Sequence, residues 1–86
     1  MLTKTLTIKN PQGLHARPAT VFVQKASSFS SSINIIKGGK KINGKSIMGL
    51  MTLAAKQGDE IILEADGPDE QEAINELGKV LEMVHD

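Results

Sequence analysis

The chain has 86 residues, with ten basic and ten acidic residues and no cysteine, tryptophan or tyrosine. This length predicts a single domain over residues 1–86, whose small core is built from aliphatic side chains. The lack of cysteine excludes disulfides and thiolate metal sites. No apolar run reaches membrane-spanning length and no signal peptide is found, so a soluble, cytoplasmic protein without membrane association is expected.

The charged residues divide between two parts of the chain. Residues 1–58 carry nine Lys or Arg and no acid, whereas residues 59–86 carry ten acids and one base, Lys79. One interpretation is ordinary charge balance within a folded domain. The other is that a surface built from the first part attracts acidic partners or phosphate groups. Direct binding to nucleic acid is disfavoured, because the chain lacks stacking aromatic residues and an arginine cluster.

Hydrophobic periodicity and turn residues predict four strands and three helices. In chain order these are a strand over residues 2–8, a helix over 16 to about 27, strands over 33–37 and 40–43, a helix over 46 to about 54, a strand over 59–66 and a final helix that starts at 67–69. The pair Gly38-Gly39 predicts a tight hairpin between the second and third strands. This βαββαβα order favours an α+β fold, with the helices on one side of a mainly antiparallel sheet.

The first candidate site is the stretch Gly13-Leu14-His15-Ala16-Arg17-Pro18-Ala19 at the start of the first helix. Acidic residues normally fill the first turn of a helix, but this turn carries Arg17 and no acid, which favours a bound anion. A positive helix end keeps His15 mostly neutral, so a ring nitrogen is able to attack a phosphoryl donor. Arg17 would then donate charge-assisted hydrogen bonds to the phosphoryl group. The alternative is a surface or capping histidine.

The second candidate site is Ser46, which opens the second helix after Lys45 and is followed by no acid. Serine is a good helix N-cap, and a phosphate on it would also be favoured at this position. In the helix itself Ile47, Met48 and Met51 lie on a different face from the other apolar residues. We expect these three to form a partly exposed, methionine-rich docking patch, although all of them could instead belong to the core.

Other kinds of site are disfavoured. Residues 39–46 match the G-x-x-x-x-G-K-S pattern of a phosphate-binding loop, but the hairpin explains these glycines and the chain is too short for the parallel sheet that such a loop needs. His85 has no partner in the sequence and is interpreted as inert. No paired-histidine or Ser/His/Asp arrangement is found, so neither a metal nor a cofactor is expected.

Together, residues 13–19 and the segment Lys45-Ser46-Ile47-Met48-Gly49-Leu50-Met51 resemble HPr, the histidine-containing phosphocarrier of the bacterial sugar phosphotransferase system. The resemblance covers the whole chain in length, element order and motif spacing. It implies an open-faced β-sandwich, in which three helices pack on one face of a four-stranded antiparallel sheet. It also implies a phosphoryl-group carrier that is not itself an enzyme.

The resemblance further implies roles for single residues. His15 accepts a phosphoryl group on Nδ1 from enzyme I, which is charged by phosphoenolpyruvate, and passes it to the IIA domains of sugar permeases. Arg17 matches the phosphate-binding arginine of the family. Ser46 matches the regulatory serine of the Gram-positive branch, which HPr kinase/phosphorylase phosphorylates with ATP. In that branch the serine-phosphorylated form binds a LacI-type catabolite repressor. The expected partner-binding residues are Thr20, Ile47, Met48 and Met51.

Two hypotheses therefore stay open: a phosphocarrier acting through His15, and a regulatory binding module acting through Ser46 and the methionine-rich patch. In a paralogue of the family that is specialised for catabolite repression, glutamine replaces the active histidine. This chain keeps His15, which argues against that specialised role. Ser46 and the residues after it resemble the Gram-positive branch, whereas Phe22 is more similar to the enteric branch. A monomer is expected.

Overall fold

The computed structural model describes residues 1–11, 13, 16–53 and 55–82. The elements in chain order are β1 (Leu2–Thr7), α1 (Ala16–Ser27), β2 (Ser32–Lys37), β3 (Lys40–Asn43), α2 (Ile47–Leu53), β4 (Glu60–Asp66) and α3 (Glu70–Glu82). This is the predicted βαββαβα order. Glycine allows the positive φ angles of 56° and 82° at Gly38 and Gly39, which confirm the tight turn between β2 and β3.

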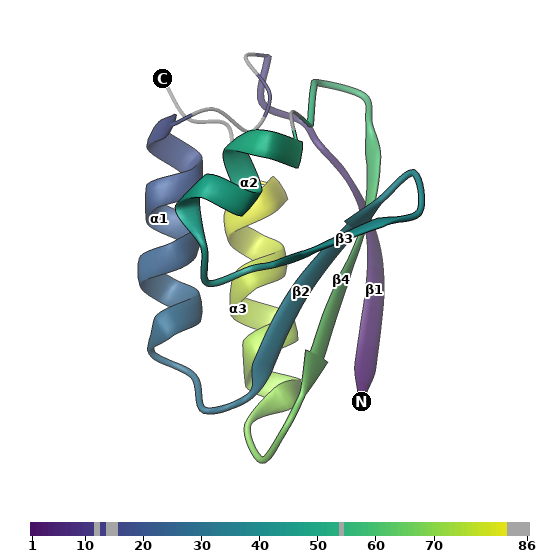
Figure 1. Ribbon diagram of the computed structural model, residues 1–86. Coiled ribbons are helices and arrows are strands. Elements are labelled where there is room, and N and C mark those ends of the chain that lie inside the picture. The colour runs from purple at the N-terminus through teal and green to yellow at the C-terminus, as the bar shows by residue number, and fades with distance from the viewer. Residues whose placement is uncertain (12, 14–15, 54, 83–86) are drawn as a thin grey trace.

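The four strands form one sheet in the order β1-β4-β2-β3, and each neighbouring pair is antiparallel. All three helices lie on the same side of this sheet and leave its other face open (Figure 1). The open-faced β-sandwich is therefore confirmed. β4 lies in the middle of the sheet, where Leu63 is opposite Lys4 of β1 and Ile35 of β2.

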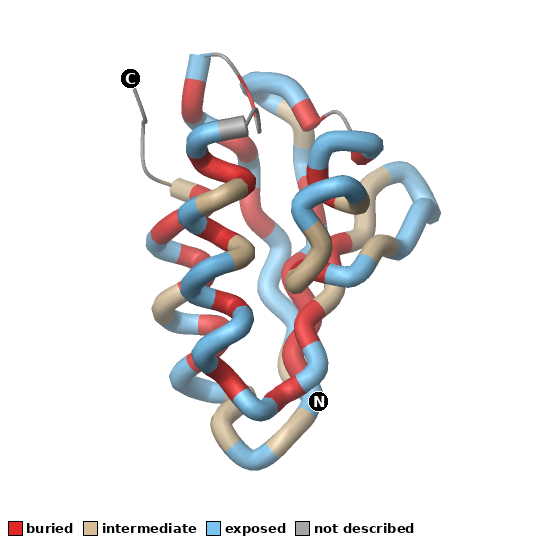
Figure 2. Tube along the Cα trace, turned by 60° about the vertical axis from the view of Figure 1, so that its left-hand side comes forward, coloured by how far each residue is buried: buried red, intermediate tan, exposed pale blue. Residues whose placement is uncertain are grey.

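The core lies between the sheet and the helices. Ile61, Leu63 and Ala65 of β4 are fully buried, while the alternate residue Ile62 is exposed on the open face. α3 presents a buried stripe that includes Leu77, and the buried residues of strands and helices recur along their facing sides (Figure 2). The apolar alternation and helical spacing in the sequence thus mark the inner faces correctly.

The two oppositely charged parts of the chain are interleaved in the fold. Ion pairs join them at Lys41–Glu64, with Nζ 2.9 Å from Oε1, and at Lys37–Asp59, with Nζ 3.1 Å from Oδ2. These contacts support the interpretation of the charge division as balance within one domain. Lys45 forms no ion pair within 4.0 Å among the described residues, so no carboxylate there neutralises its charge.

Asp69 ties the start of α3 to the loop between α1 and β2. Its carboxylate accepts hydrogen bonds from the backbone N–H groups of Ser30 and Ser31, at 2.8 and 2.9 Å, and from the Ser31 hydroxyl at 2.5 Å. The Ser31 hydroxyl and then the Ser30 amide stabilise the ionised form, which lowers the pKa of Asp69 below its ordinary value. This contact closes the end of the sandwich opposite to the first turn of α1.

Some element ends differ from the sequence-based expectations. β1 ends at Thr7 instead of residue 8, because Ile8 bonds to the turn before β4: its N–H donates to Asp59 at 2.9 Å and its carbonyl accepts from Gly58 at 2.8 Å. α2 begins at Ile47, since Ser46 acts as its cap.

The predictions for Ala54 and His85 lie outside the described residues. No helix in the described ranges has both the length and the hydropathy to span a membrane.

Candidate functional site

The first candidate site lies around the start of α1. His15, the expected phosphoryl acceptor, lies outside the described residues. α1 begins at Ala16, so the helix starts where the sequence predicted, and it has no acidic residue in its first turn. Pro18 is tolerated because its missing N–H has no partner within the helix at that position. Arg17, in the same turn, is exposed.

The turn that leads into α1 is held by Asn10 and Gly13. Asn10 is only 2% exposed, and its amide Nδ2 donates to the carbonyl oxygen of Gly13 at 3.0 Å. In the same turn the N–H of Gly13 donates to the carbonyl of Asn10 at 2.8 Å. Gly13 has a φ of +70°, which favours glycine. Asparagine three residues before glycine is common in turns, but the sequence does not show that the Asn10 side chain itself bonds to Gly13.

The exposed face of α1 continues from Arg17. Thr20 is half-buried and Val21 is 38% exposed, and both lie one turn further along from Arg17. An exposed valine among otherwise polar neighbours extends the candidate partner-binding surface. No pattern in the sequence singles out Val21, because its helical spacing places it beside the buried stripe instead of within it.

Ser46 caps α2. Its hydroxyl oxygen accepts the N–H of Gly49 at 3.1 Å, and its carbonyl accepts the N–H of Leu50 at 3.1 Å, which starts the helix. The turn before it is fixed by Asn43, whose side-chain oxygen accepts the N–H of Lys45 at 2.9 Å. Lys45 in turn donates from Nζ to the carbonyl of Phe29 at 2.8 Å. Ser46 is thus half-buried at a well-fixed position, and the predicted N-cap is confirmed.

The two faces of α2 separate as predicted. Leu50 and Leu53 are buried, whereas Ile47 is 42%, Met48 78% and Met51 45% exposed. These three exposed side chains, which we call the α2 patch, share a short helix that packs beside α1 (Figure 1). The alternative in which all of them belong to the core is wrong. A flexible apolar surface of this kind suits partners of different shapes.

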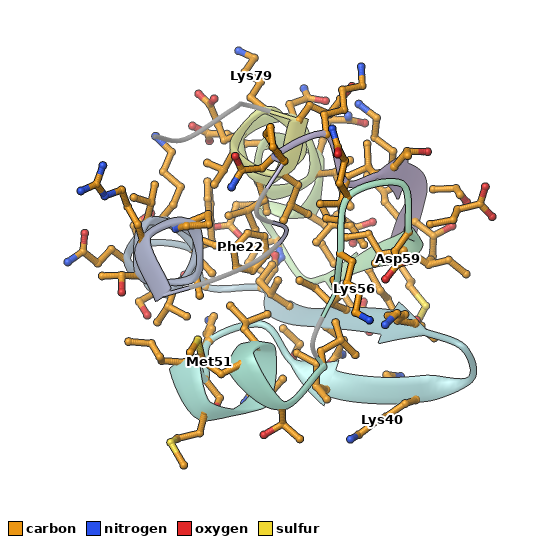
Figure 3. The ribbon with its side chains drawn as sticks, turned by 90° about the horizontal axis from the view of Figure 1, so that it is seen from above. Phe22, Lys40, Met51, Lys56, Asp59 and Lys79 are labelled. Atoms are coloured by element: carbon orange, nitrogen blue, oxygen red, sulfur yellow. The ribbon has the colours of Figure 1, made fainter. Side chains whose placement is uncertain are left out.

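Phe22 of α1 lies in the core against the turn that carries Ser46, and it therefore connects the two candidate sites. It is fully buried and lies between α1 and the neighbouring elements (Figure 3). A Cβ atom added at Gly44 would lie 3.1 Å from Phe22 Cε1 and 2.7 Å from Ile33 Cγ2. The turn that carries Ser46 therefore rests directly on the buried face of α1, and only glycine fits at this point.

Among residues 1–11, 13, 16–53 and 55–82, no three His, Cys, Asp or Glu side chains come together in a way that could hold a metal ion. The described residues around the start of α1 and around Ser46 combine an exposed arginine, a lysine, a helix-capping serine and apolar side chains. These features are typical of a surface that binds a phosphoryl group and docks other proteins.

A small open-faced β-sandwich with such a surface defines a class of phosphoryl-carrier proteins. The family model described as the PTS HPr component phosphorylation site matches residues 2–83. The chain belongs to the HPr family. HPr proteins are phosphocarriers of the phosphotransferase system and not enzymes.

Similar proteins include both HPr and its relative Crh, a protein connected with catabolite repression. The chain is 49% identical over 77 residues to the HPr-like protein Crh of Bacillus subtilis, which covers 90% of this chain and 91% of that protein. The structure of HPr-C-His from Thermoanaerobacter tengcongensis has a TM-score of 0.91 and 53% identity, covering 94% of this chain and 91% of that one. An HPr dimer from the same organism has a TM-score of 0.74 and 54% identity, covering 93% and 92%.

Proposed function

We propose that this chain carries phosphoryl groups on His15. Nδ1 of His15 attacks the phosphorus atom of phospho-enzyme I, a new N–P bond forms, and the donor's bond to phosphorus breaks. A nucleophile of a IIA domain then takes the group and returns His15 to its free state. This role requires the cytoplasm, where enzyme I and phosphoenolpyruvate meet. Arg17 binds the transferred group through charge-assisted hydrogen bonds.

One observation carries this proposal: the first turn of α1 holds an exposed arginine and no acid, directly after His15 in the sequence. Ordinary helix starts favour acids, because the free N–H groups there carry partial positive charge. An anion would satisfy this turn, and a transiently bound phosphoryl group is such an anion.

The test is phosphoryl transfer from enzyme I and phosphoenolpyruvate. We expect one acid-labile phosphate per chain, which the His15→Ala variant cannot accept. Arg17→Glu should keep the fold, as judged by circular dichroism, but should transfer much more slowly because it replaces attraction for phosphate with repulsion. Absence of acid-labile phosphate on the wild-type chain would reject the carrier function. Normal kinetics for Arg17→Glu would remove only Arg17 from the mechanism.

A second function is supported by Ser46 and the α2 patch. We propose that HPr kinase/phosphorylase phosphorylates Ser46 with ATP and that the modified chain then binds a LacI-type catabolite repressor. The support is the half-buried Ser46 hydroxyl at the start of α2, beside the exposed Ile47, Met48 and Met51. A phosphate adds nearly two negative charges there and should weaken docking to enzyme I.

Phosphorylation by the kinase, with Ser46→Ala as the control, tests this regulatory function. Ser46→Asp keeps a good cap and adds one charge, so it should fold normally and slow transfer from enzyme I at low salt. Unchanged transfer in Ser46→Asp at low salt would contradict the electrostatic explanation. An unmodified Ser46 after incubation with kinase and ATP would leave His15 transfer as the only function.

The α2 patch and Thr20 are proposed as the surface that enzyme I and the IIA domains share. Met48→Ala and Met51→Ala should weaken docking with little change in stability, since both side chains are exposed. A monomer also stays a prediction, because one similar HPr structure is a dimer. Light scattering after size-exclusion chromatography measures the mass directly.

A further inference from the structure

Lys37, the last residue of β2, contacts the end of α2. Its Nζ lies 3.5 Å from the carbonyl oxygen of Leu53, the last helical residue. α2 has no basic residue in its own last turn. The free carbonyls at a helix C-terminus favour a nearby cation, and the neighbouring strand provides it here.

Lys37 also pairs with Asp59, in the segment between α2 and β4. Its Nζ lies 3.1 Å from Asp59 Oδ2, and the two side chains are only 29% and 33% exposed. Lys37 is the least exposed lysine in any ion pair within the described ranges. Because both side chains are partly shielded from solvent, the geometry of this ion pair is better defined than that of a fully exposed pair. We call Lys37 and Asp59 the clasp.

Asp59 fixes the backbone of the segment that contains it. The same Oδ2 accepts the N–H of Lys56 at 2.8 Å, and the N–H of Asp59 donates to the carbonyl of Lys56 at 2.9 Å. The Lys56 amide first, and then Lys37, lower the pKa of Asp59, so the carboxylate is ionised at neutral pH. Lys56 and Asp59 lie together on the loop that follows α2 (Figure 3).

The same segment also contacts Gly13 in the turn before α1. A Cβ atom at Gly13 would lie 2.4 Å from the carbonyl oxygen of Ala55 and 2.9 Å from Cα of Lys56. Gly13 therefore packs directly on the backbone that Asp59 holds. Residues 55–59 thus contact both Lys37 at the end of β2 and Gly13, four residues before the exposed Arg17.

We propose that Lys37 and Asp59 are positioning residues for the phosphoryl-transfer site. The clasp holds residues 55–56 in place, and these residues in turn contact Gly13, which comes shortly before His15 in the sequence. Neither side chain touches the transferred group. The inference rests on the proposed carrier function, and it adds residues that neither sequence motif contains.

The test compares Lys37→Met, Asp59→Ala and a conservative Lys37→Arg variant with the wild-type chain. Lys41→Met is the matched control, because it removes the other lysine–carboxylate pair of the same hairpin, and Lys41 has no hydrogen bond or ion pair with Leu53 or residues 55–59. Amide chemical shifts and hydrogen exchange report on Gly13, Lys56 and α1. The transfer rate at saturating enzyme I reports on the site itself.

Both clasp variants should shift the Gly13 and Lys56 amides and lower the saturated transfer rate by about tenfold, less than the ~100-fold cost of a misplacement of about 1 Å. Lys37→Arg should restore the rate, and Lys41→Met should leave it unchanged. The clasp variants change the net charge in opposite directions. A general electrostatic effect on docking would therefore move their rates in opposite directions and would overturn the proposal.

Unchanged Gly13 shifts in both clasp variants would also overturn it, as would an equal loss of rate in Lys41→Met. Melting curves check that the variants fold, and Lys37→Met, which removes the same ion pair, keeps the test usable where Asp59→Ala is too unstable. If the wild-type chain showed no phosphoryl transfer at all, the carrier function itself would be rejected. The chemical shifts would then still decide whether the clasp holds Gly13.

Discussion

Replacing Gly13 with alanine tests the closest backbone approach near the start of α1. Two separate effects act on this substitution. The φ of +70° is costly for any residue with a Cβ atom, and that atom would lie 2.4 Å from the carbonyl oxygen of Ala55. Ordinary contact begins near 3.4 Å, so one of the two backbone segments would have to move by about 1 Å.

Gly38→Ala separates the two effects. Gly38 has a φ of +56°, but nothing lies within 4 Å of an added Cβ atom there. The control should therefore show only the conformational cost, about 1–2 kcal/mol. Gly13→Ala should add a steric cost of about 1–3 kcal/mol, as in an overpacked core.

Urea unfolding gives the change in the free energy of unfolding of both variants, from the shift of the transition midpoint when the slope is unchanged. We expect Gly13→Ala to be clearly less stable than Gly38→Ala and to transfer phosphoryl groups more slowly. Equal losses of stability in the two variants would show that Gly13 does not press on residues 55–56. That result would also remove the contact through which the clasp acts.

Three further predictions concern the cap of α2, the core and pH. Ser46→Ala should lower the free energy of unfolding by about 1 kcal/mol, because the N–H of Gly49 loses its acceptor; no loss in urea unfolding would contradict the cap. Phe22→Ala should cost about 3–5 kcal/mol, since it leaves a cavity under Gly44, whereas Val21→Ala on the exposed face of α1 should stay within about 0.5 kcal/mol. The lowered pKa of Asp69 implies stability that is fully present above its unfolded value of 3.8 and is lost as the pH falls through the lower folded value. The stability difference between wild type and Asp69→Asn should therefore be largest at neutral pH and shrink in acid; a constant difference down to pH 2 would contradict this assignment.

Much of the fold follows from local patterns in the sequence. Alternation along β4 marks Ile61, Leu63 and Ala65 as the inner face, because successive side chains of a strand point to opposite sides. Helical spacing separates Leu50 from Met48 for a similar reason. The cap at Ser46 and the turn at Gly38-Gly39 are also local, since each depends on the conformation of only a few neighbouring residues.

Contacts between distant segments could not be predicted in this way. The placement of β4 between β1 and β2 decides which lysine pairs with which acid, and nothing near Lys37 in the sequence points to Asp59. The same is true of Gly13 and Ala55, which lie far apart in the sequence and come into contact only in the folded chain.

The sequence by itself thus determined the elements and their inner faces, and it predicted which residues bind phosphate. Those properties depend on backbone conformation and side-chain chemistry within one or two turns of chain. Only the tertiary structure decided what holds the two candidate sites in place: Phe22 beneath Gly44, and the clasp behind Gly13. Packing and ion pairing act through space, so residues far apart in the chain become neighbours only when the sheet and helices come together.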